Sequence, residues 1–128
     1  MPQFSDYATK YQHMRMERGE DGILEVTLHS DGGSLQWDFV AHEELPRAFY
    51  EIAEDQENRV VILTGSGEDF IGPRETGGPH RLFTSTPSIP FLEKVIFEGK
   101  QLLMNFLNIQ APVISALAVT TAAPPPDG

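Results

Sequence analysis

The chain has 128 residues, 40% of them apolar, which is enough for one domain with a modest core. Its 19 Asp and Glu outnumber 9 Lys and Arg, and the formal charge of −10 argues against nucleic acid or an anionic membrane surface as a partner. The absence of cysteine excludes disulfides and thiolate chemistry, and without a basic leader or a bilayer-length apolar stretch the expected location is the cytoplasm.

The first part of the chain predicts an irregular arm followed by a hairpin. Residues 1–11 are polar with scattered aromatic side chains and are expected to form the arm. Apolar and polar residues alternate at 12–18 and again at 23–29, which is the pattern of half-buried strands. Charged residues and glycine at 19–22 mark the turn between these strands.

The next elements are a helix and an apolar strand. Apolar residues recur with a period of 3.6 from Ala41 onward, so a helix is expected to begin near this residue, with Pro46 in its first turn. Residues 59–64 (RVVILT) form a continuous apolar run of strand length. Such a run is typical of a central strand that is covered on both faces.

The second half of the chain predicts a long connection, a helix and a last strand. The connection, 65–89, is rich in glycine and proline, and the helix should begin near residues 88–91 and contain Gly99. Residues 113–119 (VISALAV) predict a buried strand, and 120–128 form a low-complexity tail. The expected fold class is therefore α/β, with a mixed sheet, and a partial domain over residues 12–119.

The glycine turn after the third predicted strand has several interpretations. Gly65-Ser66-Gly67 follows a strand as a dinucleotide-binding fingerprint does, but Phe70 stands where its third glycine would be and no helix follows directly. A Walker A loop is excluded because no Gly-Lys-Ser/Thr is present. An ordinary loop that needs small residues is a further interpretation.

A wider pattern resembles the crotonase (enoyl-CoA hydratase/isomerase) superfamily. The segments that carry the resemblance are ILEVTLH, VVILTGSGEDFIG and QAPVISAL, which occur in the family's order over about residues 12 to 118. The segment SLQWDFVAHEEL, with Trp37 and His42, is similar to the branch that contains a β-diketone (6-oxocamphor) hydrolase. The resemblance implies a crotonase-like ββα spiral fold that is truncated after its first half.

The resemblance also implies a site and its chemistry. Family members bind a thioester or ketone oxygen with two backbone N–H groups as that oxygen becomes an enolate. The implied first donor is Gly72, with Phe70, Ile71 and Glu75 in the substrate-binding segment, although Pro73 stands where the family has glycine. His42 is the implied catalytic side chain and Trp37 an implied wall of the substrate pocket, whereas a surface histidine and a core tryptophan are the alternatives.

Three functions remain open from the sequence. A CoA thioester is the implied substrate of a hydratase or isomerase, and a cyclic β-diketone is that of a C–C bond hydrolase. The family's second donor, in an Asn-Gly turn, is missing here, so an inactive fragment or non-enzymatic remnant is the third alternative. No bound cofactor and no metal are expected, and the family's habit is a homotrimer or hexamer.

Overall fold

The computed structural model describes residues 3–72 and 88–117, which contain three helices and four strands. In chain order, the elements are α1 (Phe4–Tyr7), β1 (Met14–Arg18), β2 (Ile23–Leu28), α2 (Phe39–Glu54), β3 (Val60–Gly65), α3 (Ile89–Leu107) and β4 (Val113–Ala116). From β1 onward this is the order that the sequence predicts. The tail and most of the long connection lie outside the described residues.

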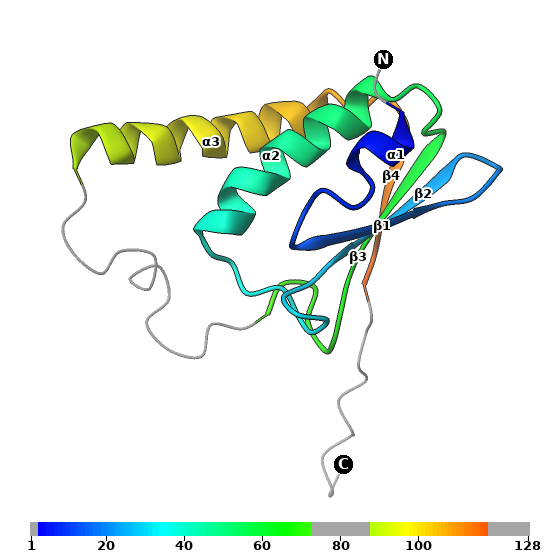
Figure 1. The fold of residues 1–128 in the computed structure, drawn as a ribbon, viewed down its shortest axis with the longest axis horizontal. Coiled ribbons are helices and arrows are strands. Elements are labelled where there is room, and N and C mark those ends of the chain that lie inside the picture. The colour runs from blue at the N-terminus through cyan, green and yellow to red at the C-terminus, as the bar shows by residue number, and fades with distance from the viewer. Residues whose placement is uncertain (1–2, 73–87, 118–128) are drawn as a thin grey trace, which may run out of the picture.

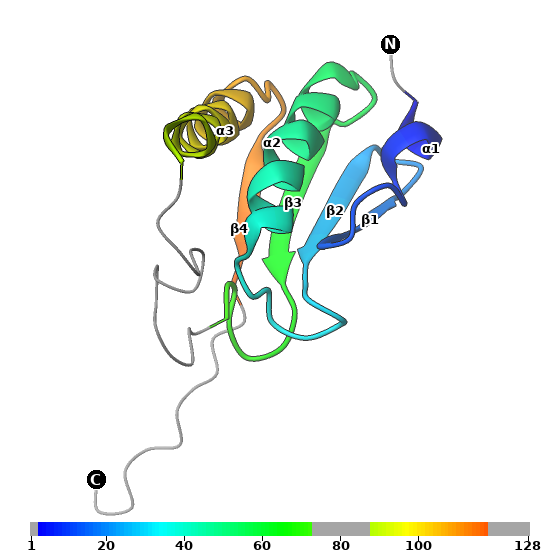
Figure 2. The ribbon, with the colours of Figure 1, turned by 60° about the vertical axis from the view of Figure 1, so that its left-hand side comes forward.

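The four strands form one mixed sheet in the order β1-β2-β3-β4. β1 and β2 are an antiparallel hairpin, whereas β2, β3 and β4 run parallel to one another. Both parallel connections contain a helix, and α2 and α3 lie side by side on the same face of the sheet (Figures 1 and 2). The predicted α/β class with a mixed sheet is confirmed.

The core lies between α2 and this face of the sheet. In β2, Leu24 and Val26 are buried, and each lies beside a buried residue of β3, Val61 and Leu63. The period of α2 supplies the opposing layer. Its buried residues are Ala41, Leu45, Pro46, Ala48, Phe49 and Ile52.

The other face of β3 corrects the expectation of a strand covered on both faces. Only alternate residues of β3 are buried, and Val60, Ile62 and Thr64 are half-buried on the opposite side. In the described part of the chain both long helices pack on one face, so the sheet is a single covered layer there. A continuous apolar run in the sequence shows that both faces of a strand can be buried. It does not show which face the helices of the same chain cover.

Helix α2 begins earlier than the sequence predicts, and this changes the position of Pro46. Asp38 is the N-cap, and its carboxylate accepts the Ala41 N–H at 2.8 Å. Pro46 therefore lies inside the helix rather than in its first turn. Because proline has no N–H, the carbonyl of His42 lacks its usual helical donor, a local cost that the buried face of α2 offsets.

The N-terminal arm is ordered rather than irregular. Residues 4–7 form a short helix, and Tyr7 is fully buried. The Tyr7 hydroxyl donates to Asp55 Oδ2 at 2.6 Å and accepts from Asn58 Nδ2 at 3.0 Å. Arg18 from β1 donates to the same carboxylate oxygen at 2.6 Å and to Asn58 Oδ1 at 2.9 Å.

This network changes the pKa of the Asp55 carboxyl. Burial by itself would raise the pKa of the carboxyl, but hydrogen bonds from Tyr7 and Arg18 outweigh it and hold the pKa below its ordinary 3.8. The pKa of the Tyr7 phenol, in contrast, is raised by burial and by the hydrogen bond to Asp55. The phenol therefore keeps its proton and acts as a donor.

Helix α3 begins where the sequence predicts and is less buried than α2. Ser88 is its N-cap and accepts the Phe91 N–H at 3.3 Å. No residue of α3 is fully buried. Within residues 3–72 and 88–117, no helix combines the length and the apolar character that a membrane span requires.

We expect Asp55→Asn to lower the free energy of unfolding by about 3 kcal/mol at pH 7, because it leaves Arg18 without a carboxylate to pair with. The folded-state pKa of Asp55 is lowered, so its contribution is complete above the ordinary 3.8 and is lost as the pH falls through the folded value. Urea unfolding of both proteins from pH 7 to pH 3 should show their stabilities converging. Glu20→Gln, in the exposed β1–β2 turn, is the control; an equal loss in both variants would contradict the assignment.

Candidate site at the end of the parallel strands

Two loops meet where the parallel strands β2 and β3 end. Loop A (29–38) follows β2 and leads into α2, and loop B (66–72) follows β3. Loop B is held to the end of β2 by the Ser66 N–H, which donates to the Leu28 carbonyl at 3.1 Å. It is held to loop A by the Asp69 N–H, which donates to Ser34 Oγ at 3.2 Å. The carboxyl end of parallel strands is where α/β folds usually place their ligands.

Glycine allows the two loops to approach this closely. Gly67 has a positive φ of 74°, and a Cβ added there would lie 2.6 Å from Ser34 Oγ. The glycine turn of the sequence therefore has a structural purpose, which is to let loop B fold against loop A.

The structure corrects the expected role of the Gly72 amide. Its N–H donates to the Leu35 carbonyl at 2.6 Å, so this donor is engaged by the main chain of loop A. Gly72 is buried, and an added Cβ would lie 3.0 Å from the Leu35 oxygen and also contact the side chain of Gln36. Gly72 thus fixes loop B to loop A through its amide.

Trp37 and His42, two of the predicted site residues, lie beside each other. Their rings meet edge to face with centroids 5.9 Å apart. His42 Nε2 lies 2.8 Å from the Val95 carbonyl of α3. Because a carbonyl can only accept, Nε2 carries the proton in this contact and Nδ1 holds the lone pair when the ring is neutral.

Gly99, in the middle of α3, lies beside His42. A Cβ added at Gly99 would lie 3.7 Å from His42 Cε1, which is an ordinary van der Waals contact. A methyl group at this position would therefore fit beside the imidazole without displacing it. His42 therefore connects the first turn of α2 to the neighbouring helix.

The sequence did not single out His13, which is buried beneath the start of α2. The side chain is 3% exposed, and its Nδ1 lies 2.9 Å from the His29 carbonyl of loop A. Its Nε2 lies 3.2 Å from Asp38 Oδ1, but in a direction that does not make a hydrogen bond, so the contact is an ion pair only when the imidazole is protonated. The sequence contains one signal for the place beside which His13 lies. Asp38 stands three positions before the apolar Ala41, which is the pattern of a helix N-cap.

The other predicted residues have different surroundings. Phe70 packs against the core, and Ile71, which follows it, is 41% exposed. Glu75 lies outside the described residues. The predicted group is therefore divided into Trp37 with His42, near the start of α2, and Phe70 to Gly72, against loop A.

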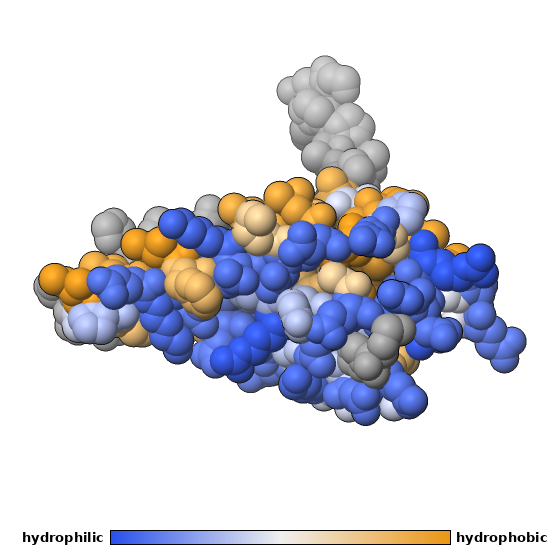
Figure 3. Space-filling model, turned by 90° about the horizontal axis from the view of Figure 1, so that it is seen from above, coloured by the Kyte–Doolittle hydropathy of each residue, from blue (hydrophilic) through white to orange (hydrophobic). Residues whose placement is uncertain are grey.

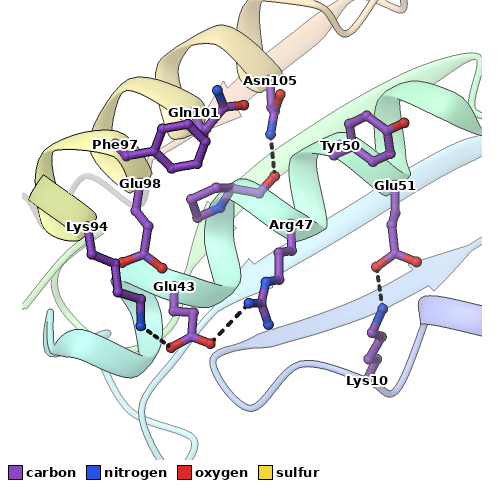
Figure 4. Close-up of a pocket in the computed structure, with 11 residues that line it drawn as sticks. Lys10, Glu43, Arg47, Tyr50, Glu51, Lys94, Phe97, Glu98, Gln101 and Asn105 are labelled. Carbon is purple, nitrogen blue, oxygen red and sulfur yellow. Dashed lines mark hydrogen bonds and ion pairs between the residues drawn. The ribbon is translucent and has the colours of Figure 1, made fainter. Parts of the chain in front are cut away.

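The groove in Figure 4 is separate from this group. It lies between α2 and α3, has a volume of about 750 Å³, and includes none of the predicted site residues. Several of its charged side chains form ion pairs: Glu43 with Arg47 at 3.2 Å and with Lys94 at 3.7 Å, and Lys10 with Glu51 at 2.9 Å. Across the described ranges, no three His, Asp or Glu side chains are arranged to hold a metal ion.

Comparison with solved structures identifies the fold. A β-diketone hydrolase from the cyanobacterium Anabaena, solved with (S)-3-oxocyclohexyl acetic acid bound, is 39% identical with a TM-score of 0.69, over 90% of this chain and 43% of its own. The chain belongs to the crotonase superfamily. An enoyl-CoA hydratase from Mycobacterium smegmatis, with 24% identity and a TM-score of 0.62 over 80% of this chain and 38% of its own, shares the fold.

The predicted recognition is thereby confirmed, including the likeness to the β-diketone hydrolase branch. An enoyl-CoA hydratase/isomerase from Mycobacterium paratuberculosis also shares the fold, at 20% identity and a TM-score of 0.65, over 82% of this chain and 41% of its own. This crotonase-fold chain spans less than half the length of each of the three relatives. No family model and no curated protein sequence match it.

We expect Gly72→Ala to lower the free energy of unfolding by about 1 kcal/mol, because the new methyl group must displace the Leu35 carbonyl or Gln36. Gly33→Ala is the matched control, since a Cβ there would meet only the Ser30 oxygen, at 3.7 Å. Urea unfolding measures both. A larger loss for Gly33→Ala would contradict the close packing of loop B on loop A.

Proposed function

We propose that this crotonase-superfamily chain forms part of a site for C–C bond hydrolysis of a cyclic β-diketone. The observation that carries the proposal is the 39% identity to a β-diketone hydrolase over 90% of the chain, against 24% and 20% for two enoyl-CoA hydratases. The paired rings of Trp37 and His42 support it, because they lie in the segment that resembles this branch.

The proposed reaction needs a base and an oxyanion donor. Water adds to one carbonyl carbon of the diketone, and the bond from this carbon to the carbon between the carbonyls breaks. The electron pair moves into an enolate on the second carbonyl, which is then protonated to give a keto acid. A ring ketone with a carboxylate arm, such as (S)-3-oxocyclohexyl acetic acid, is the product class that hydrolysis of a bicyclic β-diketone gives.

His42 is proposed to orient or activate the attacking water. Its Nε2 is held by the Val95 carbonyl, so Nδ1 is the nitrogen that has a lone pair to accept a proton. The edge contact with Trp37 fixes the ring from the other direction and contributes apolar surface for a ring ketone.

The oxyanion donor must be an amide other than that of Gly72, which the Leu35 carbonyl already engages. Preorganised backbone donors are typically worth about 2.7–4 kcal/mol of transition-state stabilisation.

A CoA thioester is the second candidate substrate, and the observation that favours it is the shared fold with the enoyl-CoA hydratases. The enolate chemistry is the same in both cases, and a backbone donor serves a thioester oxygen as well as a ketone oxygen. The two candidates differ in the part of the ligand that lies away from the reacting carbonyl. They can therefore be separated by binding.

We expect (S)-3-oxocyclohexyl acetic acid to raise the melting temperature of the purified chain, and a short enoyl-CoA thioester to leave it unchanged. At a ligand concentration about 100 times Kd, binding to the folded state stabilises it by about 2.7 kcal/mol. Differential scanning fluorimetry over a ligand series measures the shift. A shift with the thioester alone would select the second candidate, and no shift with either would contradict the proposed site.

His42→Ala should abolish the ligand-induced rise in melting temperature. The rise is measured against the ligand-free variant, because loss of the Val95 contact also lowers the stability of the chain. His29→Ala is the matched control, since this half-buried loop A imidazole only accepts the Gly32 N–H at 3.2 Å. The ligand-induced rise in melting temperature of His29→Ala should equal that of the wild type. An undiminished shift in His42→Ala would remove this histidine from the proposed site.

A further inference from the structure

The apolar residues of α3 fall on two different faces. Those that contact α2 and the core include Leu102 and Phe106, whose ring packs on Phe49 at 5.2 Å. A second set recurs at helical spacing and is exposed by 38% to 73%. These residues form what we call the α3 stripe, which comprises Ile89, Leu92, Ile96, Leu103 and Leu107.

The sheet also exposes apolar side chains, at the edge nearest to α3. Along the face that the helices do not cover, the register aligns Glu17 with Glu25, then Ile62, then Ile114. The face is charged at β1 and β2 and apolar at β3 and β4, where Ile114 is 54% exposed. The uncovered face of the sheet is therefore polar at the hairpin and carries exposed apolar surface at β4.

The outer edge of β4 is also open for strand pairing in the described residues. The sheet ends at β4, and Pro112 accepts the Val61 N–H at 2.9 Å. A regular parallel ladder then directs the N–H groups of Val113 and Ser115 away from β3. α3 and β4 lie together on the side of the molecule opposite β1 (Figure 2), and apolar side chains show at the surface in the view from the α3 side (Figure 3).

We propose that the α3 stripe and the outer edge of β4 form one docking surface for a polypeptide that carries the remainder of the crotonase fold. It would add a strand beside β4 and cover the α3 stripe with an apolar face. The observation that selects this occupant is the alignment of 90% of this chain with only 43% of the Anabaena enzyme, whose corresponding elements belong to a chain more than twice as long. The net charge of −10 disfavours an anionic lipid surface as the occupant.

The test is to co-express the chain with the part of the Anabaena enzyme that lies outside the matched region. We expect a 1:1 complex by light scattering after size exclusion, with amides of α3 and β4 more protected from hydrogen exchange than in the chain alone. The double variant Ile96→Glu, Leu103→Glu should weaken the complex at least about tenfold, because both side chains are exposed in the free chain and would be buried in the complex.

Two further variants separate docking from folding. Ser115→Pro removes an amide that points away from β3 and should weaken the complex by a similar factor while leaving the circular dichroism spectrum unchanged. Val40→Glu is the matched control, because it places the same charge at an exposed aliphatic residue of α2 and should leave binding unchanged. Failure to form a complex, equal binding by all variants, or a homodimer that the α3 substitutions disrupt would overturn the proposal. Each readout is association alone, so the outcome is independent of the proposed catalysis.

Discussion

The pairing of loop A with loop B is the constraint on which the rest of the site depends. The parallel register of β2 and β3 ends both strands at the same level, so the loops that follow them must share one space. They do so through the Gly72 N–H, which the Leu35 carbonyl accepts, and through Gly67, which leaves room for Ser34. Once loop A is fixed in this way, Asp38 caps α2, and the first turn of the helix carries His42 to α3.

The same constraint explains why the Gly72 amide is engaged by the main chain of loop A. A glycine that lets two backbones approach can serve either a ligand or another segment of the chain, and the sequence pattern is the same in both cases. Here the approaching backbone is that of Leu35, at hydrogen-bond distance. Family membership therefore establishes the fold of this region more firmly than it establishes which of its amides would take part in chemistry.

The chain has one part whose apolar side chains are enclosed in a core and another part whose apolar side chains are largely exposed. The hairpin, β3 and α2 enclose a core, and the Tyr7, Arg18, Asp55 and Asn58 network closes its far end with hydrogen bonds at 2.6 to 3.0 Å. α3 and β4 contribute only part of their apolar surface to that core. A helix without a fully buried residue gains less from tertiary packing, the main source of helix stability in proteins, than α2 does.

From β1 onward, the sequence by itself determined the order of the elements and their type, because periods of two and of 3.6 residues are local properties of the chain. The alternation of Leu24, Val26 and Leu28 predicts one buried face of β2, and Ser88 predicts the start of α3. Only the tertiary structure decided the burial of Tyr7, the interior position of Pro46 and the partner of the Gly72 amide. Each of these depends on a contact between residues far apart in the chain, or on a cap whose position relative to the helix start is set by such contacts, and no local pattern records it.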